Sequence, residues 1–281
     1  MMKIRIIAIL MISALTIASC TTVELTERDA FDIKRTIRPD YFQNTPYSIE
    51  EVLFDADDSL RLNGWHMTRD GSRGTVLYFG GNGFVMVSSY HIIKAFLDQN
   101  VDLFVFDYRG YGENPGAPTV SGLKEDGLAA YDYLINEKRV DPEELVIHGH
   151  SLGTFVAAYV ATQREASGLV LECPITDAQD WTGRLVPWFL KPFINFDIDP
   201  ALKENSNLVR VSSVDIPLLV FAGGQDKVTP PGMAETIYET AGSASKRIVV
   251  IEDGGHNDLP NRKEYADALN AFYDMLDGFT R

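Results

Sequence analysis

Short apolar runs alternate with helical patterns along most of the 281-residue chain. The runs cover residues 49–54, 60–67, 75–79, 101–106, 145–147, 168–171, 216–221 and 248–251. Continuous apolar strands are typical of a parallel sheet that helices bury on both faces. The sequence therefore predicts an α/β fold with a mostly parallel central sheet, in which functional residues gather at the carboxyl ends of strands.

Helical periodicity fills several of the gaps between these runs. Helices are expected around residues 92–97, over 120–135, 152–162 and 259–276, and from Thr229, where two prolines suit a first helical turn. The first two runs flank an acidic turn at residues 55–58, which predicts a hairpin. With 45% apolar residues, the chain can build the core of a single domain, which we assign to residues 46–281.

The first twenty residues have the organisation of an export signal. Lys3 and Arg5 precede an apolar run over residues 6–17, which is too short to span a bilayer comfortably, and small residues follow it up to Cys20. This order indicates a signal peptide over residues 1–19, with a permanent membrane anchor as the alternative.

The ending of this leader, IASC, resembles the lipobox of bacterial lipoproteins. The resemblance implies cleavage before Cys20, acylation of that residue and lipid anchoring in the bacterial cell envelope. Because residue 21 is threonine and not aspartate, the outer membrane is favoured, with the protein facing the periplasm or the cell surface. Residues 20–45 are polar and weakly patterned, as expected of a tether that leads into the domain.

The net charge of −15 argues against a nucleic-acid partner, because an acidic surface repels phosphate groups. The two cysteines, Cys20 and Cys173, are too few for a disulfide framework. The histidines are scattered, and the sequence contains neither a known metal-binding motif nor a nucleotide fingerprint. No metal or other cofactor is therefore expected.

The stretch GHSLG, residues 149–153, places a serine between two glycines and matches the pattern G-x-S-x-G. Chance produces this pattern often, but here it follows an apolar strand and opens a helix, which is the setting of a nucleophile elbow. A serine hydroxyl becomes a good nucleophile only when a base removes its proton. Ser151 is the predicted nucleophile, and a histidine must be its partner.

Among the five histidines, His256 differs because it follows the last predicted strand directly, in EDGGHND, where a loop could reach the elbow. Asp226 follows the strand at residues 216–221 and is the predicted group that orients the imidazole. The order Ser151, Asp226, His256 is the one expected of α/β-hydrolases. Asp177 is the alternative acid.

Acyl transfer also requires hydrogen-bond donors for the developing oxyanion. The backbone N–H of Leu152, directly after Ser151, is one predicted donor. The second is the backbone N–H of Asn82, in the glycine-rich loop after residues 75–79, although a plain glycine turn is the alternative interpretation of that loop.

Taken together, these segments resemble a serine hydrolase of the Bem46-like group of α/β-hydrolases, related to the serine aminopeptidase-like hydrolases. The matching pieces are DADDSLRLNGWHM, LYFGGNG, FDYRGYGENPG, GHSLG, FAGGQDKVTP and GGHND, spread over residues 48–276. The resemblance implies that Arg109 holds a structural loop and is not catalytic. One departure is that Gly80 stands where family members usually carry histidine.

An apolar insertion over residues 174–214 separates two predicted strands. In this superfamily such a segment forms a short cap over the nucleophile. Its apolar side chains either shelter an acyl chain or pack the cap onto the body. The expected activity is cleavage of a small ester or thioester, including substrates with an apolar acyl chain. A serine peptidase and a catalytically silent envelope binding module are the alternatives.

Overall fold

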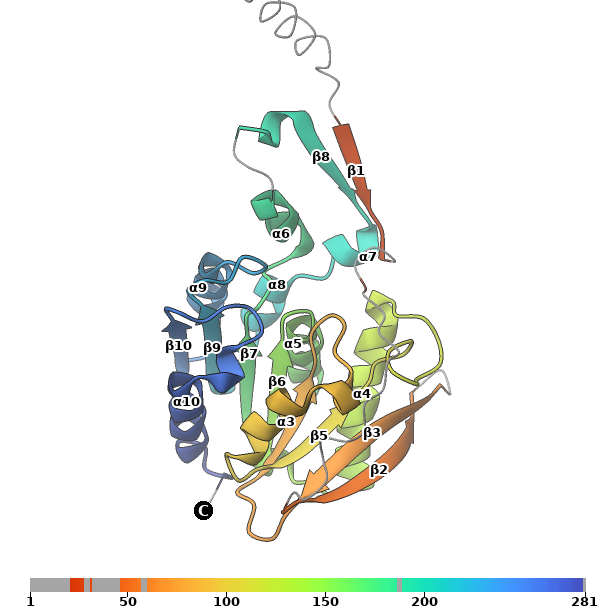
Figure 1. Cartoon of the computed structure of the whole chain (residues 1–281), viewed down its shortest axis with the longest axis vertical. Coiled ribbons are helices and arrows are strands. Elements are labelled where there is room, and N and C mark those ends of the chain that lie inside the picture. The colour runs from red at the N-terminus through yellow and green to blue at the C-terminus, as the bar shows by residue number, and fades with distance from the viewer. Residues whose placement is uncertain (1–20, 28–30, 32–45, 57–59, 186–188, 280–281) are drawn as a thin grey trace, which may run out of the picture.

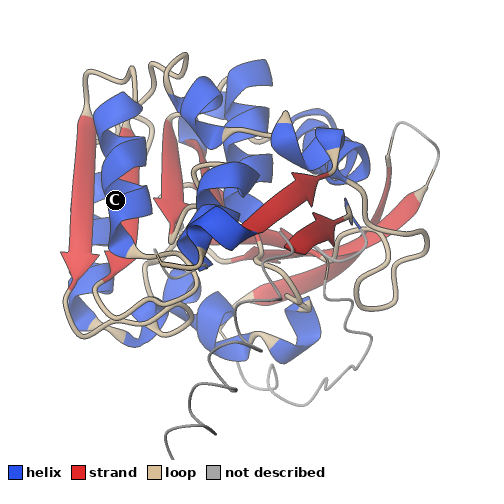
Figure 2. Ribbon diagram, turned by 90° about the horizontal axis from the view of Figure 1, so that it is seen from above, coloured by secondary structure: helices blue, strands red, loops and turns tan. Residues whose placement is uncertain are grey.

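The computed structural model describes residues 21–27, 31, 46–56, 60–185 and 189–279. Figure 1 shows a central sheet flanked by helices, with a two-stranded arm that projects beyond one end of the body. Figure 2, seen from above, shows helices on both sides of the sheet. This layered arrangement is that of an α/β protein.

The central sheet has the strand order β10-β9-β7-β6-β4-β5-β3-β2. The strands are β2 (Ser48–Asp55), β3 (Arg61–Thr68), β4 (Thr75–Phe79), β5 (Asp102–Phe106), β6 (Leu145–His150), β7 (Gly168–Glu172), β9 (Leu218–Gly223) and β10 (Lys246–Ile251). β2 and β3 form the predicted hairpin, and β3 also runs antiparallel to β5. All other neighbours are parallel, so the predicted fold class is confirmed.

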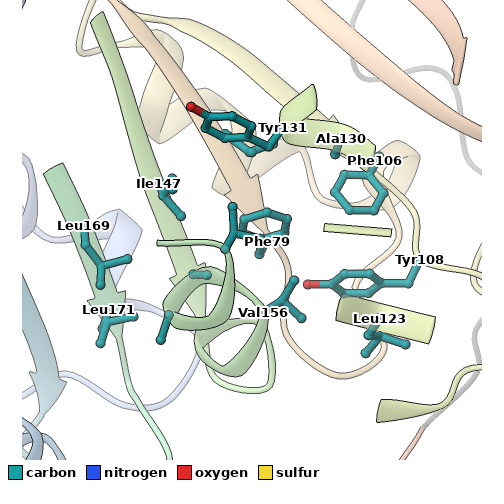
Figure 3. Close-up of a cluster of buried hydrophobic side chains, with 14 of the residues drawn as sticks. Phe79, Phe106, Tyr108, Leu123, Ala130, Tyr131, Ile147, Val156, Leu169 and Leu171 are labelled. Atoms are coloured by element: carbon teal, nitrogen blue, oxygen red, sulfur yellow. The ribbon is translucent and has the colours of Figure 1, made fainter. Parts of the chain in front are cut away.

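Strand β4 shows why this sheet needs helices on both faces. All its residues are buried; Leu77 and Phe79 belong to one core and Val76 and Tyr78 to the other. The first core includes side chains of α4 (Val120–Asn136), α5 (Gly153–Gln163) and α9 (Pro231–Thr240), and the second those of α3 (Tyr90–Leu97) and α10 (Lys263–Asp274). Figure 3 shows Phe79 among the side chains of the first core.

The last helix begins later than the sequence predicts. A short 3-10 turn covers Leu259–Asn261, and Arg262 then adopts an extended conformation with φ −99° and ψ 141° before α10 starts. Pro260 accounts for the first part of this break, because proline supports a first turn but cannot donate the hydrogen bond that a helix interior needs.

The insertion between β7 and β9 forms a cap at the carboxyl ends of the parallel strands. It consists of α6 (Ala178–Leu185), the 3-10 turn η4 (Lys191–Phe193), β8 (Ile194–Ile198), α7 (Pro200–Lys203) and α8 (Asn207–Val211). β8 pairs in parallel with β1 (Thr21–Leu25), and together they make the arm in Figure 1. A stretch interpreted from sequence as part of a tether therefore supplies a strand to the cap.

Candidate active site

Ser151 sits in a tight turn between β6 and α5, with a left-handed φ of 51°. Glycines on both sides make this turn possible. A Cβ at Gly149 would lie 2.5 Å from the carbonyl oxygen of Gly153, and one at Gly153 would lie 2.1 Å from that of Phe79. The close approach of strand and helix lifts the Ser151 hydroxyl above the sheet, as the elbow pattern predicts.

Two loops bring a histidine and an aspartate to this hydroxyl. The Nε2 atom of His256, after β10, lies 3.0 Å from the Oγ atom of Ser151. Its Nδ1 atom lies 2.7 Å from Oδ2 of Asp226, after β9. The structure thus joins the three residues nominated by the sequence into one hydrogen-bonded chain, although 105 positions separate serine and histidine.

Asp226 is held as an anion by several donors. The N–H groups of Val228 and Thr229 donate to Oδ1, at 2.8 and 2.9 Å, and the Thr229 hydroxyl donates to Oδ2 at 2.7 Å. Burial raises the pKa of the Asp226 carboxyl, but the hydrogen bond and charge of His256 and the Thr229 donors outweigh it and lower the pKa to about 2. The carboxylate therefore stays charged and can support an imidazolium.

The alternative acid has a different partner. The Oδ1 atom of Asp177 accepts the backbone N–H of Asp180 at 2.7 Å, so its carboxylate serves the first turn of α6. Side chains that accept such hydrogen bonds stabilise helix starts. The geometry favours Asp226 over Asp177 as the partner of His256.

The two predicted oxyanion donors flank the nucleophile. Leu152 is the N-cap residue of α5, where helix N–H groups carry partial positive charge. Asn82 lies in the loop after β4 and lines the same cavity as Ser151, and its side-chain oxygen accepts the Tyr111 hydroxyl at 2.8 Å. Gly81, just before it, would bring a Cβ to 3.4 Å from that of Ser151.

The loop around Arg109 has the structural role that the family resemblance implies. Its guanidinium Nη2 lies 2.7 Å from Oδ1 of the fully buried Asp126, and its backbone N–H donates to Oδ2 of the same carboxylate at 2.9 Å. Two tyrosines of the same loop contact the loop after β4, because Tyr108 donates to the carbonyl oxygen of Gly80 at 3.3 Å and Tyr111 donates to Asn82. Arg109 therefore ties its own loop to α4, and the two tyrosines beside it contact the loop that carries Asn82.

A buried polar network lies beneath the nucleophile, and no motif in the sequence indicates it. Glu172, at the end of β7, accepts the backbone N–H of Ser151 at its carbonyl oxygen. Its carboxylate contacts Nε2 of His148 at 3.2 Å and accepts the Tyr265 hydroxyl at 2.9 Å. Burial raises the pKa of Glu172, but the His148 hydrogen bond and the neighbouring histidine charges outweigh it, so the pKa is lowered. Residue spacing could not reveal this group because its members come from three separate elements.

His150, the variable position of the motif, also has a defined partner. Its Nε2 atom lies 2.9 Å from the backbone carbonyl oxygen of His256. A Cβ at Gly81 would lie 2.7 Å from its Nδ1 atom, so the imidazole is wedged between two loops of the site. These contacts place His150 directly behind the proposed base.

A cavity of about 240 Å³ opens above Ser151. Its lining is mostly apolar: Leu25, Asn82, His150, Ser151, Leu152, Phe155, Ile175, Ala178, Trp181, Leu202, Val228, His256 and Asn257. The cap supplies Ala178, Trp181 and Leu202, and β1 supplies Leu25. No described lining residue is acidic or basic apart from the two histidines.

Within the described ranges, one group of side chains has the spacing of metal ligands. The ligand atoms of His150, Cys173 and His256 lie within 4.8 Å of one another. Both histidines already have partners, and burial raises the pKa of the Cys173 thiol well above its usual range. A thiol must lose its proton to bind a metal, so this group does not fit a resident ion.

The strand order, the elbow after β6 and the chain order of the three side chains are those of the α/β-hydrolases, and the molecule is of this class. More narrowly, the chain belongs to the serine aminopeptidase S33 family, whose model matches residues 70–206 and 203–262.

The chain is also similar in sequence to curated relatives and in fold to solved structures. Rv2307c of Mycobacterium tuberculosis is 34% identical over 226 residues, covering 79% of this chain and 78% of its own. The membrane protein YNL320W of Saccharomyces cerevisiae is 27% identical over 231 residues, covering 81% of this chain and 79% of its own. An esterase of Pyrococcus furiosus, Pf2001, superposes with a TM-score of 0.70 at 19% identity, over 88% of this chain and 98% of its own.

Proposed function

We propose that the protein is a serine hydrolase that cleaves a carboxylic ester or thioester through an acyl-enzyme. The observation that carries this proposal is the hydrogen-bonded chain from Ser151 Oγ through His256 to Asp226, at 3.0 and 2.7 Å. Nucleophile, base and orienting acid in this arrangement make up the machinery of acyl transfer.

Acylation begins when Ser151 Oγ attacks the substrate carbonyl carbon and its proton passes to Nε2 of His256. The new imidazolium is stabilised by the Asp226 carboxylate. The carbon–oxygen or carbon–sulfur bond to the leaving group then breaks, and His256 returns the proton to that group. Water next attacks the acyl-enzyme, gives a proton to His256, and releases the acid with Ser151 restored.

Negative charge develops on the carbonyl oxygen in both steps. The backbone N–H groups of Leu152 and Asn82 are the proposed donors to it. Their support is positional: Leu152 starts α5 and Asn82 lines the cavity from the opposite loop. Loss of one such donor typically lowers kcat about 100- to 1,000-fold.

The cavity favours an apolar acyl group over a peptide. Apolar side chains such as Leu25, Phe155 and Trp181 form most of its wall, and its described lining offers no carboxylate for a peptide ammonium group. The family description as serine aminopeptidases makes peptidase activity the second candidate. A silent binding module is the third, and the ordered triad geometry argues against it.

The same proposal covers the location of the protein. Acylation of Cys20 after removal of residues 1–19 would anchor it in the cell envelope, with the outer membrane favoured. Cys20 lies outside the described residues, and the support is the leader sequence. In the described part of the chain, no helix has the length and apolarity to cross a membrane.

A fluorophosphonate probe tests the proposal. Wild-type protein is expected to react, Ser151→Ala to lose labelling and turnover, and Ser121→Ala, on the exposed surface of α4, to keep both. Graded p-nitrophenyl esters, acyl thioesters and aminoacyl anilides then separate the candidates. Labelling with cleavage of anilides alone would identify a peptidase, and absence of Ser151-dependent labelling would favour the binding module.

A further inference from the structure

The amino-terminal segment is fixed to the rest of the protein at three places. β1 pairs with β8 over five positions, from Thr21 opposite Ile194 to Leu25 opposite Ile198. The carboxylate of Glu27 accepts the backbone N–H of Val120 at 2.8 Å. Phe31 is buried in the core that includes α4 and α5. This part of the chain therefore has a set position relative to the cap.

The two ends of β1 have different neighbours. Leu25, at its end, lines the cavity above Ser151. Thr21, at its start, follows Cys20 directly. Four residue steps along a strand span about 13 Å. The point where the chain leaves the described structure is thus about 13 Å, measured along the strand, from a wall of the cavity.

Large apolar side chains gather at that same outer end of the arm. Because the strands are parallel, Thr21 lies opposite Ile194, and the residues just before Ile194 share its end. Among them Phe189 is 57% exposed, Leu190 38% and Phe193 50%. Large apolar side chains that are exposed next to one another mark an interaction surface. Lys191 stands among them and is also exposed.

The leader sequence is the support for one occupant of this surface, a lipid bilayer. Residues 6–17 are apolar and end just before Cys20. If the leader is removed and Cys20 is acylated, the start of β1 lies at a membrane; if the leader is retained as an anchor, it lies there too. Aromatic and aliphatic residues with a neighbouring lysine suit the boundary between lipid headgroups and acyl chains.

We propose that the outer end of the cap, formed by Phe189, Leu190, Lys191 and Phe193, docks on the lipid bilayer that holds the amino terminus, and that the enzyme takes its acyl ester from that bilayer. This substrate class rests on the proposed hydrolase function. The cavity of about 240 Å³ is smaller than the roughly 300–1,000 Å³ of pockets that enclose a drug-sized ligand. A cavity of this volume suits the acyl group of an amphiphilic ester, while the rest of that molecule stays in the membrane.

Turnover in vesicles tests the proposal. The full chain, purified from membranes with its amino terminus intact, is reconstituted into phosphatidylcholine vesicles that contain a fluorogenic long-chain acyl ester, and p-nitrophenyl butyrate serves as the soluble substrate. The double variant Phe189→Ser with Phe193→Ser is expected to hydrolyse the vesicle ester about tenfold more slowly and the soluble ester at the wild-type rate.

The matched control is Leu53→Ser, which removes a side chain 59% exposed on β2, in the body of the protein. It is expected to leave both rates unchanged. Equal vesicle turnover in the double variant, the control and the wild type would overturn membrane docking. Absence of Ser151-dependent turnover of both esters would overturn the proposed hydrolase function instead.

A measurement without turnover locates the surface directly. Tryptophan fluorescence of Phe193→Trp, compared with the wild-type background, is expected to be quenched by vesicles of brominated phosphatidylcholine. The same substitution at Leu53 is expected to give no added quenching. Absence of added quenching at residue 193 would overturn the assignment of the cap to the membrane, whatever the result at residue 53.

Discussion

The Nε2 atom of His150 lies 2.9 Å from the backbone carbonyl oxygen of His256. A carbonyl oxygen only accepts hydrogen bonds, so this nitrogen carries the proton. Burial lowers the pKa of the His150 imidazole, which keeps the ring neutral with a single N–H. The residue before the nucleophile therefore holds the loop that presents the proposed base.

Removing the hydrogen bond from His150 to His256 should impair catalysis because the imidazole of His256 would shift. His150→Ala is expected to lower kcat about 10- to 100-fold with little change in KM, because small displacements of a catalytic group have effects of this size. His150→Gln, whose amide can donate to the same carbonyl, is expected to restore part of the rate. Steady-state kinetics on a p-nitrophenyl ester measure both. Equal losses in the two variants would contradict a role for the donated hydrogen bond.

Neutralising Asp226 should have a larger effect. Asp226→Asn keeps the size of the side chain but removes the charge that stabilises the imidazolium, and kcat is expected to fall about 10,000-fold. The matched control is Asp177→Asn, which alters a carboxylate that serves the start of α6. Comparable losses of kcat in the two variants would count against Asp226 as the partner of His256.

Position 81 has room for glycine only. An alanine Cβ there would lie 2.7 Å from Nδ1 of His150 and 3.4 Å from Cβ of Ser151. Gly81→Ala is expected to displace the loop that carries Asn82, the proposed oxyanion donor, and to lower kcat/KM at least about tenfold. Gly183→Ala in α6, where a Cβ meets nothing within 4 Å, is the control and is expected to be neutral. Wild-type kinetics for Gly81→Ala would refute the tight packing of this loop.

A buried carboxyl makes stability depend on pH. Asp107 accepts the backbone N–H of Met86 at 2.8 Å, and burial raises its pKa to about 7 from the ordinary 3.8. A raised folded-state pKa contributes stability that is complete below pH 3.8 and is lost as the pH rises through 7. The loss is on the order of 4 kcal/mol at most for this shift.

Asp107→Asn removes that titration while keeping an oxygen acceptor for Met86. The wild type loses stability as the pH rises from 4 to 8, and the variant lacks this loss. The free energy of unfolding of the variant minus that of the wild type is therefore expected to be larger at pH 8 than at pH 4. Urea denaturation at the two pH values measures the difference. Parallel pH dependence in variant and wild type would show that Asp107 does not titrate in this range.

Anchoring of the amino terminus can be tested with a single substitution. Cys20→Ser removes the thiol that would receive the diacylglycerol, so incorporation of radiolabelled palmitate and recovery in the membrane fraction are both expected to be lost. Cys173→Ser changes the other, buried thiol and is expected to retain the label. Label retained in Cys20→Ser would exclude lipidation at that position.

The sequence predicted the sheet and the elbow because each depends on local pattern. The apolar runs predicted the ends of most strands to within two residues. The glycines at 149 and 153 predicted the tight turn that holds Ser151. Chain order nominated Asp226 and His256, since functional loops follow parallel strands. These predictions needed no knowledge of which strands are neighbours.

The remaining features depend on contacts between distant parts of the chain. Residues 21–25 are too short and too polar to predict a strand by themselves, and in the structure they pair with β8. The group around Glu172 forms because β6, β7 and α10 meet, and no periodicity encodes that meeting. The position of His150 also depends on a distant segment, because its partner is the carbonyl oxygen of His256 in the loop after β10.

The pairing of β1 with β8 has a practical consequence for anyone who shortens the chain. A protein expressed from residue 46 onward would keep β8 but lose its neighbour, leaving Ile194, Phe196 and Ile198 on an open strand. Such edges invite pairing with another molecule. Trimmed preparations are expected to self-associate and to lack the wall that Leu25 adds to the cavity above Ser151, so residues 21–31 belong in any shortened version of the protein.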